Sequence, residues 1–546
     1  MQIKIMYDEI IDNITLEKPT KIIDLIKNDD KRYVGCYVGT MLKDLNYTLT
    51  TDSEVKLLTL KDSDGCRIYE ATLRFIVAMA ISNIYPKARV EYNYSVSRSV
   101  FANVTGIGHA FTIEIFNEVK KEVERIIKAD YDLTFTSNLK EESIRLFSER
   151  NMHDKVRIIE KRKNNESHYY ECNGYIDYMY LPLLSKTGDV AKYKLLFYAP
   201  GFLIMFPRYE LGGEIPEFIN EPVFQKTLKE ANIWARISGC DTILDINDTA
   251  SSNSKQFINV CEARHSRQLA QLGDKIEANC NNLRMILIAG PSSSGKTTFT
   301  SRLKVELLSR GIKPLMISMD DFYKVSDYPK DEFGKDDYEH IEAVDLKLFD
   351  ETIFKLIQGE EVSLPEFDFV KKERRFNEPI KIQKNTPILI EGIHALNEKI
   401  APSVPFDQKF KIFIAPLGQY KFDYHSPISL SDSRLIRRMV RDNYYRGTGC
   451  EKTIEMWDSV RRGEFKWIYP CQNNADFVFN SDLTYEICVL KKHALPILEA
   501  VDSNSKYFRV CRKLIRYLKL VEPIDDDWVP CNSILREFIG NSIFQK

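Results

Sequence analysis

The sequence lacks the usual marks of a secreted or disulfide-framed protein. Its 11 cysteines are an odd number, run from Cys36 to Cys531 and include no Cys-x-x-Cys pair, which argues against a disulfide frame or a cysteine zinc site. Asp8 and Glu9 stand close to the first residue, where a signal peptide would carry basic and then apolar side chains. These absences predict reduced thiols and a cytoplasmic protein.

A long apolar run and an excess of one charge are also missing. The most apolar stretch, residues 75–81, is too short to span a bilayer, so we expect no membrane segment. Lys and Arg number 77 against 79 Asp and Glu, and the resulting charge of −2 gives no general attraction to nucleic acid or anionic lipid. The 546 residues predict several domains, because single cores stop growing at roughly 250–300 residues.

One motif is present without a gap. An apolar run at 285–289 predicts a buried strand, a helical pattern follows, and GxxxxGK[ST] lies between them. The glycines allow backbone N–H groups to turn toward a triphosphate, the lysine reaches the β and γ phosphates, and a threonine hydroxyl can bind Mg²⁺. We therefore expect the nucleotide site at Gly290, Pro291, Ser292, Ser293, Ser294, Gly295, Lys296, Thr297 and Thr298.

Acidic residues follow two further apolar strands of the second half. Strands and helices alternate from residue 284 onward, which predicts a mainly parallel sheet with ligands beyond the carboxyl ends of its strands. Asp320 follows the strand at 314–319, where it could take a proton from an attacking hydroxyl. Glu391 follows the strand at 387–390 and is expected beside Mg²⁺.

A helical stretch at 433–442 carries arginines at spacings of four and then three residues. Arg434, Arg438 and Arg441 therefore share one face. Guanidinium groups match transferring phosphates because they are permanently charged bidentate donors. We interpret the stretch as a catalytic lid over ATP, with a solvated basic helix as the alternative.

Together these motifs resemble the uridine kinase and phosphoribulokinase branch of the P-loop kinases over roughly 284–490. The family's Asp-Phe-Tyr resembles the end of ISMDDFYK, its Glu-Gly-Ile resembles Glu391-Gly392-Ile393, and its RLxRRxxRD resembles the stretch from Arg434 to Asp442. The resemblance implies transfer of a phosphoryl group from ATP with Mg²⁺ to a small-molecule hydroxyl. It also implies that Asp320 is the base and that Thr297 and Glu391 bind the metal.

The acceptor-binding positions match the family less well. In the loop that reads Tyr-Asp-Phe-x-x-His-x-Arg in uridine kinases, Phe367 and Lys372 replace the Tyr and His, while Phe369 matches. Glu339 stands where the family has an Asp that contacts the ribose. Thr448 replaces the last arginine of the Arg-Gly-Arg that ends the family's lid. A pocket that pairs hydrogen bonds with one substrate rejects another. The expected substrate residues are Asp320, Tyr323, Glu339, Phe367, Lys372 and Arg374.

The first 210 residues resemble the N-terminal pair of threonyl-tRNA synthetase, a ubiquitin-like TGS module and an additional α+β domain. Ala71, Phe75, Met179 and Leu183 replace that domain's metal-type residues, which argues against a zinc or editing site. We predict a multidomain chain with a β-grasp domain at 1–61, an α+β domain at 62–210, a helical connector at 211–283, an α/β P-loop kinase domain with a mainly parallel sheet at 284–500 and a helical extension at 501–546.

The preferred hypothesis is a nucleoside kinase acting on a ribose 5′-hydroxyl. Lys372, a cation in place of a neutral base reader, supports a sugar-phosphate kinase as an alternative. A TGS-like module leaves open a second alternative, an RNA- or ribosome-associated nucleotide switch, although the near-zero net charge argues against RNA binding. The sequence leaves the acceptor and the oligomeric state, including a homo-oligomer, open.

Overall fold

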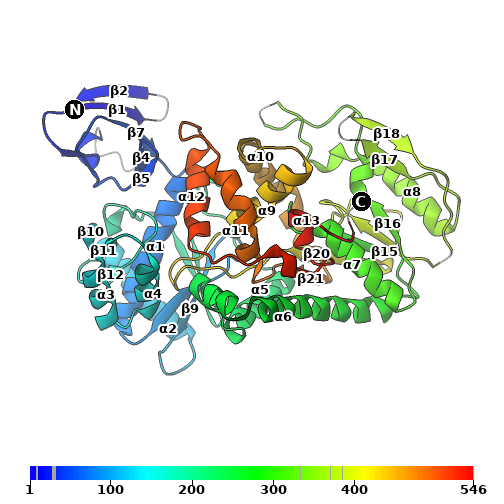
Figure 1. Ribbon diagram of the computed structural model, residues 1–546, viewed down its shortest axis with the longest axis horizontal. Coiled ribbons are helices and arrows are strands. Elements are labelled where there is room, and N and C mark those ends of the chain that lie inside the picture. Colours follow the sequence, from blue (N-terminus) through cyan, green and yellow to red (C-terminus); the bar gives the residue numbers. More distant parts are fainter. Residues whose placement is uncertain (8–9, 27–31, 333, 369–370, 384, 545–546) are drawn as a thin grey trace. The chain divides into compact units, whose positions relative to one another are not determined.

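The computed structural model describes residues 1–7, 10–26, 32–332, 334–368, 371–383 and 385–544, so Asp8, Glu9 and Phe369 lie outside it. The chain divides into two compact units (Figure 1). Unit 1 consists of Met1–Asn220, Asp241–Leu244 and Gln419–Ile428. Unit 2 consists of Glu221–Cys240, Asp245–Gly418 and Ser429–Lys546.

Unit 1 begins with a five-stranded mixed sheet in the order β2-β1-β7-β4-β5, in which β1 and β7 are parallel and the other pairs are antiparallel. Ile3, Ile5 and Val55 point to one face and are buried in a shared core, as the alternation of the strands requires. The strands are β1 Gln2–Tyr7, β2 Ile10–Thr15, β4 Gly35–Val38, β5 Met41–Lys43 and β7 Ser53–Leu58, with a small pair β3 Thr20–Lys21 and β6 Thr48–Leu49 beside them.

The rest of unit 1 surrounds the long helix α1, Ser63–Ile84. It contains the apolar run at 75–81, and every residue of that run is buried, which explains why it lacks polar side chains. A four-stranded sheet in the order β13-β14-β9-β8 and a three-stranded sheet β10-β11-β12 complete this part. Its further elements are β8 Arg89–Tyr92, β9 Val100–Thr105, α2 Ile113–Lys128, β10 Thr134–Leu139, α3 Lys140–Glu149, α4 His153–Lys161, β11 Glu166–Cys172, β12 Tyr175–Asp177, β13 Lys194–Tyr198 and β14 Gly201–Met205.

A buried ionic network fastens Gln419–Ile428, which is remote in sequence, to the rest of unit 1. The Lys155 ammonium lies 3.0 Å from an Asp177 carboxylate oxygen and 2.8 Å from one of Asp423, and all three side chains are inaccessible to solvent. The other Asp177 oxygen lies 2.5 Å from Nδ1 of His425. Arg74 donates to the carbonyl of His425. The segment is therefore part of this core.

Unit 2 is built on a parallel five-stranded sheet in the order β16-β19-β15-β20-β21, which confirms the predicted mainly parallel sheet. Helix α7 packs against β15 and β19 (Figure 1). The strands are β15 Met285–Ala289, β16 Leu315–Ser318, β19 Ile388–Glu391, β20 Lys409–Ala415 and β21 Phe477–Asn480, and a hairpin is formed by β17 Pro365–Asp368 and β18 Glu373–Phe376. The bounds of β15, β16 and β19 lie within one residue of those predicted.

The helices of unit 2 follow the predicted alternation with the strands. A kink at Asn253 interrupts the long α6, whose backbone is non-helical at that residue. The helices are α5 Pro222–Ile237, α6 Ile243–Glu277, α7 Lys296–Ser309, α8 Leu346–Gln358, α9 Leu430–Tyr445, α10 Cys450–Gly463, α11 Glu486–Glu499, α12 Phe508–Lys519 and α13 Arg536–Ile539. In the described part of the chain, none of the helices is both long and apolar enough to cross a membrane.

Candidate active site

The GxxxxGK[ST] motif forms the loop between β15 and α7. Gly295 has a φ of +87°, which a side chain would disfavour, and a Cβ added there would lie 2.4 Å from Cγ2 of Ile534. A Cβ on Gly290 would lie 2.1 Å from the carbonyl oxygen of Ile414. Neighbouring atoms of Ile534 and Ile414 therefore lie too close for any side chain at these two positions. The hydroxyls of Ser293 and Ser294 are buried without a hydrogen-bond partner among the described residues, so two polar groups remain available in the loop.

The predicted metal and proton-transfer residues meet beside this loop. The Lys296 ammonium donates to the carbonyls of Gly290 and Pro291 at 3.0 and 3.3 Å. The Thr297 hydroxyl donates to Glu391 at 3.1 Å, while the second Glu391 oxygen is buried and has no partner in the part of the chain described. Ser318 is the register partner of Glu391 on the neighbouring strand, which brings the end of β16, and Asp320 with it, to the same edge of the sheet.

The carboxyls at this edge have raised pKa values. Burial raises the pKa of Glu391 to about 7, against the lowering effect of Lys296, and the charges of Asp320 and Glu537 add to the rise. Asp320 is exposed at the surface, yet surrounding protein partly desolvates its carboxyl and raises its pKa, opposed by Lys296 and Arg446. Such crowding of carboxyls around one ammonium is typical of a functional site.

Three arginines of the predicted lid stretch contact the phosphate loop, and one of them, Arg437, donates to the Ser293 carbonyl at 3.4 Å. Arg434 donates to the Ser292 carbonyl at 2.9 and 3.1 Å, and Arg438 donates to the Ser292 hydroxyl at 2.9 Å. Both side chains are buried, so α9 is packed against the loop and is not a solvated basic helix. Burial beside Arg446 lowers the pKa of Arg441 to about 10, although Asp442 and Glu537 oppose the shift.

Sequence reasoning missed the carboxylates that hold these arginines. Glu464 pairs with Arg434 and Arg461, and it also accepts the N–H of Ser292 at 3.2 Å. Although burial raises its pKa, the two arginines outweigh burial and lower it. Arg437, which is absent from the expected set, pairs with Glu486. No local pattern marks Glu464 as a loop contact, because it lies 172 residues from Ser292 in sequence.

On the acceptor side, Glu339 lies close enough to both Lys296 and Arg438 for their charges to affect it. Burial and the Glu464 charge raise the pKa of Glu339 to about 7, and the two cations oppose this rise. The Tyr323 hydroxyl donates to the carbonyl of Tyr338 at 2.9 Å, and the Tyr323 and Phe367 rings are 6.2 Å apart.

The two predicted cations of the acceptor loop differ in their surroundings. Arg374 pairs with Asp345 at 3.2 Å and donates to the Tyr323 carbonyl at 2.7 Å, so it supports the position of Tyr323. Lys372 is exposed, and its ammonium donates to the Tyr338 hydroxyl at 3.1 Å.

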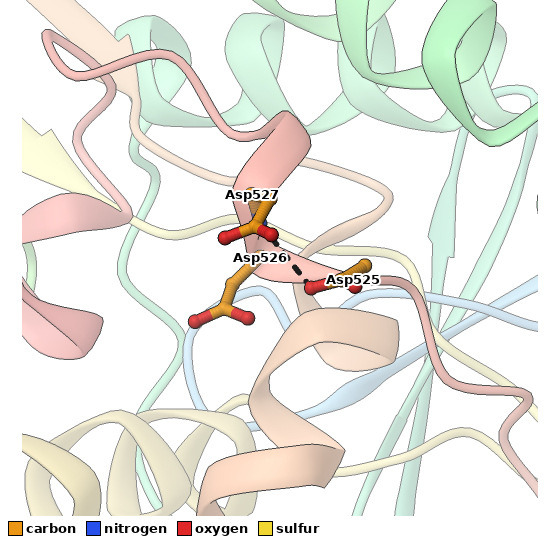
Figure 2. A group of neighbouring side chains, drawn as sticks. All are labelled: Asp525, Asp526 and Asp527. Carbon is orange, nitrogen blue, oxygen red and sulfur yellow. Dashed lines mark hydrogen bonds between the residues drawn. The ribbon is translucent and has the colours of Figure 1, made fainter.

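Two other groups of residues bear on metal binding and lie outside this site: four positions at which the synthetase-like domain would carry metal ligands, and a cluster of three aspartates. Ala71, Phe75, Met179 and Leu183 are buried members of the hydrophobic core around α1. Asp525, Asp526 and Asp527 are neighbours in a turn (Figure 2), where Asp525 accepts the Asp527 N–H at 3.4 Å. Asp526 pairs with Lys492 at 2.7 Å and with His493 at 3.2 Å. These contacts explain the acidic turn as a capped and ion-paired structure.

A phosphate loop with strand-end carboxylates and packed arginines on a parallel sheet defines a P-loop kinase type of site. Residues 285–487 match the model of the Phosphoribulokinase / Uridine kinase family. A uridine kinase from Borrelia duttonii (strain Ly) is 32% identical over 198 residues, which make up 36% of this chain and 85% of that protein. The chain belongs to the phosphoribulokinase/uridine kinase family, and it is a kinase.

The N-terminal region is similar to a different group of proteins. A threonine–tRNA ligase from Acetivibrio thermocellus is 29% identical over 166 residues, which are 30% of this chain and only 26% of that protein. A solved structure described as a possible uridine kinase from Bacillus stearothermophilus is 19% identical, covers 38% of this chain and 100% of that chain, and has a TM-score of 0.25.

Proposed function

We propose that the protein transfers the γ-phosphoryl group of ATP, with Mg²⁺, to a hydroxyl of an uncharged small molecule, and that this hydroxyl is the 5′-hydroxyl of a nucleoside. The observation that supports this most is the meeting of Lys296, Glu391 and Asp320 at one edge of the parallel sheet. The match to uridine kinases supports the nucleoside.

The residues present fit ATP and Mg²⁺. Gly290 and Gly295 allow the tight turn of the phosphate loop, and the unpartnered hydroxyls of Ser293 and Ser294 lie in the same loop. Thr297 and Glu391 offer a hydroxyl and a carboxylate, the hard oxygen ligands that Mg²⁺ prefers. When bound, Mg²⁺ would neutralise charge that develops on the transferring phosphate.

The chain's own residues position the reactants and move one proton. Lys296 would exchange its two carbonyl contacts for β and γ phosphate oxygens, and Arg438 and Arg441 would face the same charge. Arg434, held by Glu464, would keep Ser292 and the loop in place. Asp320 would accept the proton of the acceptor hydroxyl as its oxygen attacks phosphorus.

Charge favours an uncharged acceptor over a sugar phosphate. Asp320, Asp321 and Glu339 lie on the acceptor side, and desolvation by the surrounding protein raises the pKa of each of them. Of the two cations expected there, Arg374 is paired with Asp345 and Lys372 is exposed. A phosphorylated acceptor would add negative charge next to these carboxyls.

The test is a panel of acceptors. Purified full-length protein would be given ATP and Mg²⁺ with each of the common nucleosides and with sugar phosphates, and ADP release would be followed. We expect acceptor-dependent release with at least one nucleoside. Release with sugar phosphates alone would overturn the nucleoside assignment but not the kinase, and nucleotide hydrolysis that no acceptor accelerates would favour a nucleotide switch.

For the N-terminal half we propose a TGS-like β-grasp module at 1–61 followed by the synthetase-like α+β domain at 62–210. The sheet order with β1 and β7 parallel at its centre and the similarity to threonine–tRNA ligase support this proposal. The connector at 211–283, the kinase domain at 284–500, the extension at 501–546 and a cytoplasmic location remain proposals as well. Salt-dependent RNA binding by the full chain would instead support the RNA-associated alternative.

A further inference from the structure

The C-terminal segment reaches the phosphate loop. A carboxylate oxygen of Glu537, on α13, accepts the N–H of Thr298 at 3.2 Å. Thr298 is the third residue of α7, and the first N–H groups of a helix have no partner within the helix. Those groups, with the positive end of the helix dipole, are what a P-loop offers to phosphate. A protein carboxylate therefore occupies part of the anion-binding surface.

The segment that carries Glu537 is firmly packed. Ile534, Leu535 and Phe538 are fully buried, and Ile534 fills the space beside Gly295 that a Cβ would need. Arg536 donates to the carbonyls of Val529 and Asp526, and these bonds fix the start of α13. Because the backbone is anchored on both sides of Glu537, only rotation of its side chain can vacate the Thr298 amide.

The surroundings of Glu537 are those of the nucleotide site. Its charge acts on Lys296, Glu391 and Arg441, and it helps to raise the pKa of Glu391. Glu464 is a second carboxylate on the loop, but it is held between Arg434 and Arg461 at the Ser292 N–H. Glu537 instead contacts the first turn of α7, where bound phosphate gains most from the helix.

We propose that Glu537 is a residue of the nucleotide site that opposes phosphate binding at the Thr298 amide and so sets the affinity for ATP. A phosphate oxygen that approaches this amide must displace the carboxylate or lie beside a like charge, and either event weakens binding. The inference rests on the proposed use of ATP and does not depend on the acceptor.

The experiment is calorimetric titration of the full-length protein without acceptor. Glu537→Gln keeps the shape of the side chain and removes its charge, and Glu537→Ala leaves the amide open. Asp527→Asn, an exposed carboxylate of the same C-terminal region, is the matched control. The ligands are ATP, ADP and adenosine, and steady-state assays with the best acceptor supply KM for ATP and kcat.

We expect both Glu537 variants to bind ATP about tenfold more tightly, a change of about 1.4 kcal/mol, with a similar fall in KM for ATP and unchanged affinity for adenosine. Asp527→Asn should behave as the unmodified protein. ATP affinity that stays the same or weakens in both variants would overturn the inference and make Glu537 a structural cap of α7. Absence of ATP binding by the unmodified protein would instead count against the proposed function.

Discussion

The two units each contain a buried cluster of opposite charges, and the clusters differ in how many cations face their carboxyls. In unit 1, Lys155 and His425 surround Asp177 and, although burial raises the pKa of this carboxyl, the two partners outweigh burial and lower it to about 2. In unit 2, the single ammonium of Lys296 faces several carboxyls, and burial raises the pKa of Glu391 to about 7.

The difference separates a structural cluster from a chemical one. Charges that satisfy one another fix a core, as the network of Lys155 fixes Gln419–Ile428 within unit 1. Burial also raises the pKa of Asp423 in unit 1, and one of its oxygens likewise has no hydrogen-bond partner among the described residues. The unit 2 carboxyls differ in lying beside the phosphate loop, where a metal, a phosphate or a proton can use the unpartnered oxygen of Glu391.

The largest effect is expected from Asp320→Asn. The amide keeps the shape of the side chain but cannot accept the acceptor's proton, so kcat should fall by about 10²- to 10⁴-fold while ATP affinity changes little. Single-turnover phosphoryl transfer and calorimetric ATP binding measure the two quantities. Asp336→Asn, at the surface of the same region, is the control, and turnover retained by Asp320→Asn would remove Asp320 from the role of base.

Lys155→Met should break the paired cluster of unit 1. The change leaves Asp177 and Asp423 buried beside each other without their ammonium, which should cost about 3–5 kcal/mol in the free energy of unfolding. Chemical denaturation would measure the loss, with the exposed Lys163→Met as a control that we expect to change stability by less than about 0.5 kcal/mol. Equal stability of the two variants would contradict the structural role of the network.

Glu391 in unit 2 and Asp177 in unit 1 should make stability respond to pH in opposite directions. The pKa of Glu391 is about 7 in the fold against an ordinary 4.5, so the folded state binds its proton more tightly and raising the pH from 4.5 to 7 lowers the free energy of unfolding. Asp177, at about 2 against 3.8, contributes stability that is lost as the pH falls from 3.8 to 2.

Glu391→Gln tests the contribution of Glu391 to the pH dependence of stability, because glutamine does not titrate. The variant should gain about 1–2 kcal/mol over the unmodified protein at pH 7.5 and little at pH 4.5, with Glu366→Gln, another carboxyl of unit 2, as the control. Denaturation curves at both pH values supply the comparison. A gain that is the same at both values would show that the Glu391 proton is not linked to folding.

The smallest effect is expected from Lys372→Met. With an uncharged acceptor, loss of this exposed ammonium should change KM for the acceptor by less than about fivefold, since an exposed contact contributes at most about 1 kcal/mol. An increase of tenfold or more in KM for the acceptor would favour a sugar phosphate as the acceptor. Initial rates over a range of acceptor concentrations decide between these outcomes.

The sequence predicted those parts of the fold and site that depend on local motifs, and missed those that depend on contacts between residues far apart in the chain. The phosphate loop and the bounds of β15 follow from a local motif and an apolar run, and Glu391 and Asp320 follow from the rule that ligands lie at the carboxyl ends of parallel strands. Glu537 lies 239 residues from Thr298 and carries no motif, so its place beside the loop comes from tertiary packing alone.

The lid and the acceptor loop show the same limit. The spacing of Arg434 and Arg438 correctly placed both on one helix face, but only the structure shows that the two side chains hold Ser292. Arg374 matches a family position, yet its pairing with Asp345 could not be read from spacing, because the two residues belong to different elements. The docking of Gln419–Ile428 into unit 1 likewise has no local signal.

The account depends on Lys296, Asp320 and Glu391 acting together on one phosphoryl group. Phosphorus NMR of the full-length protein with ATP, Mg²⁺ and uridine tests this most directly, because it follows both the donor and the product. We predict that the γ-phosphate signal is replaced by that of a phosphomonoester coupled to the 5′ protons of the nucleoside. Formation of ADP and inorganic phosphate without any phosphomonoester, with uridine and every other hydroxyl compound tried, would contradict the central claim.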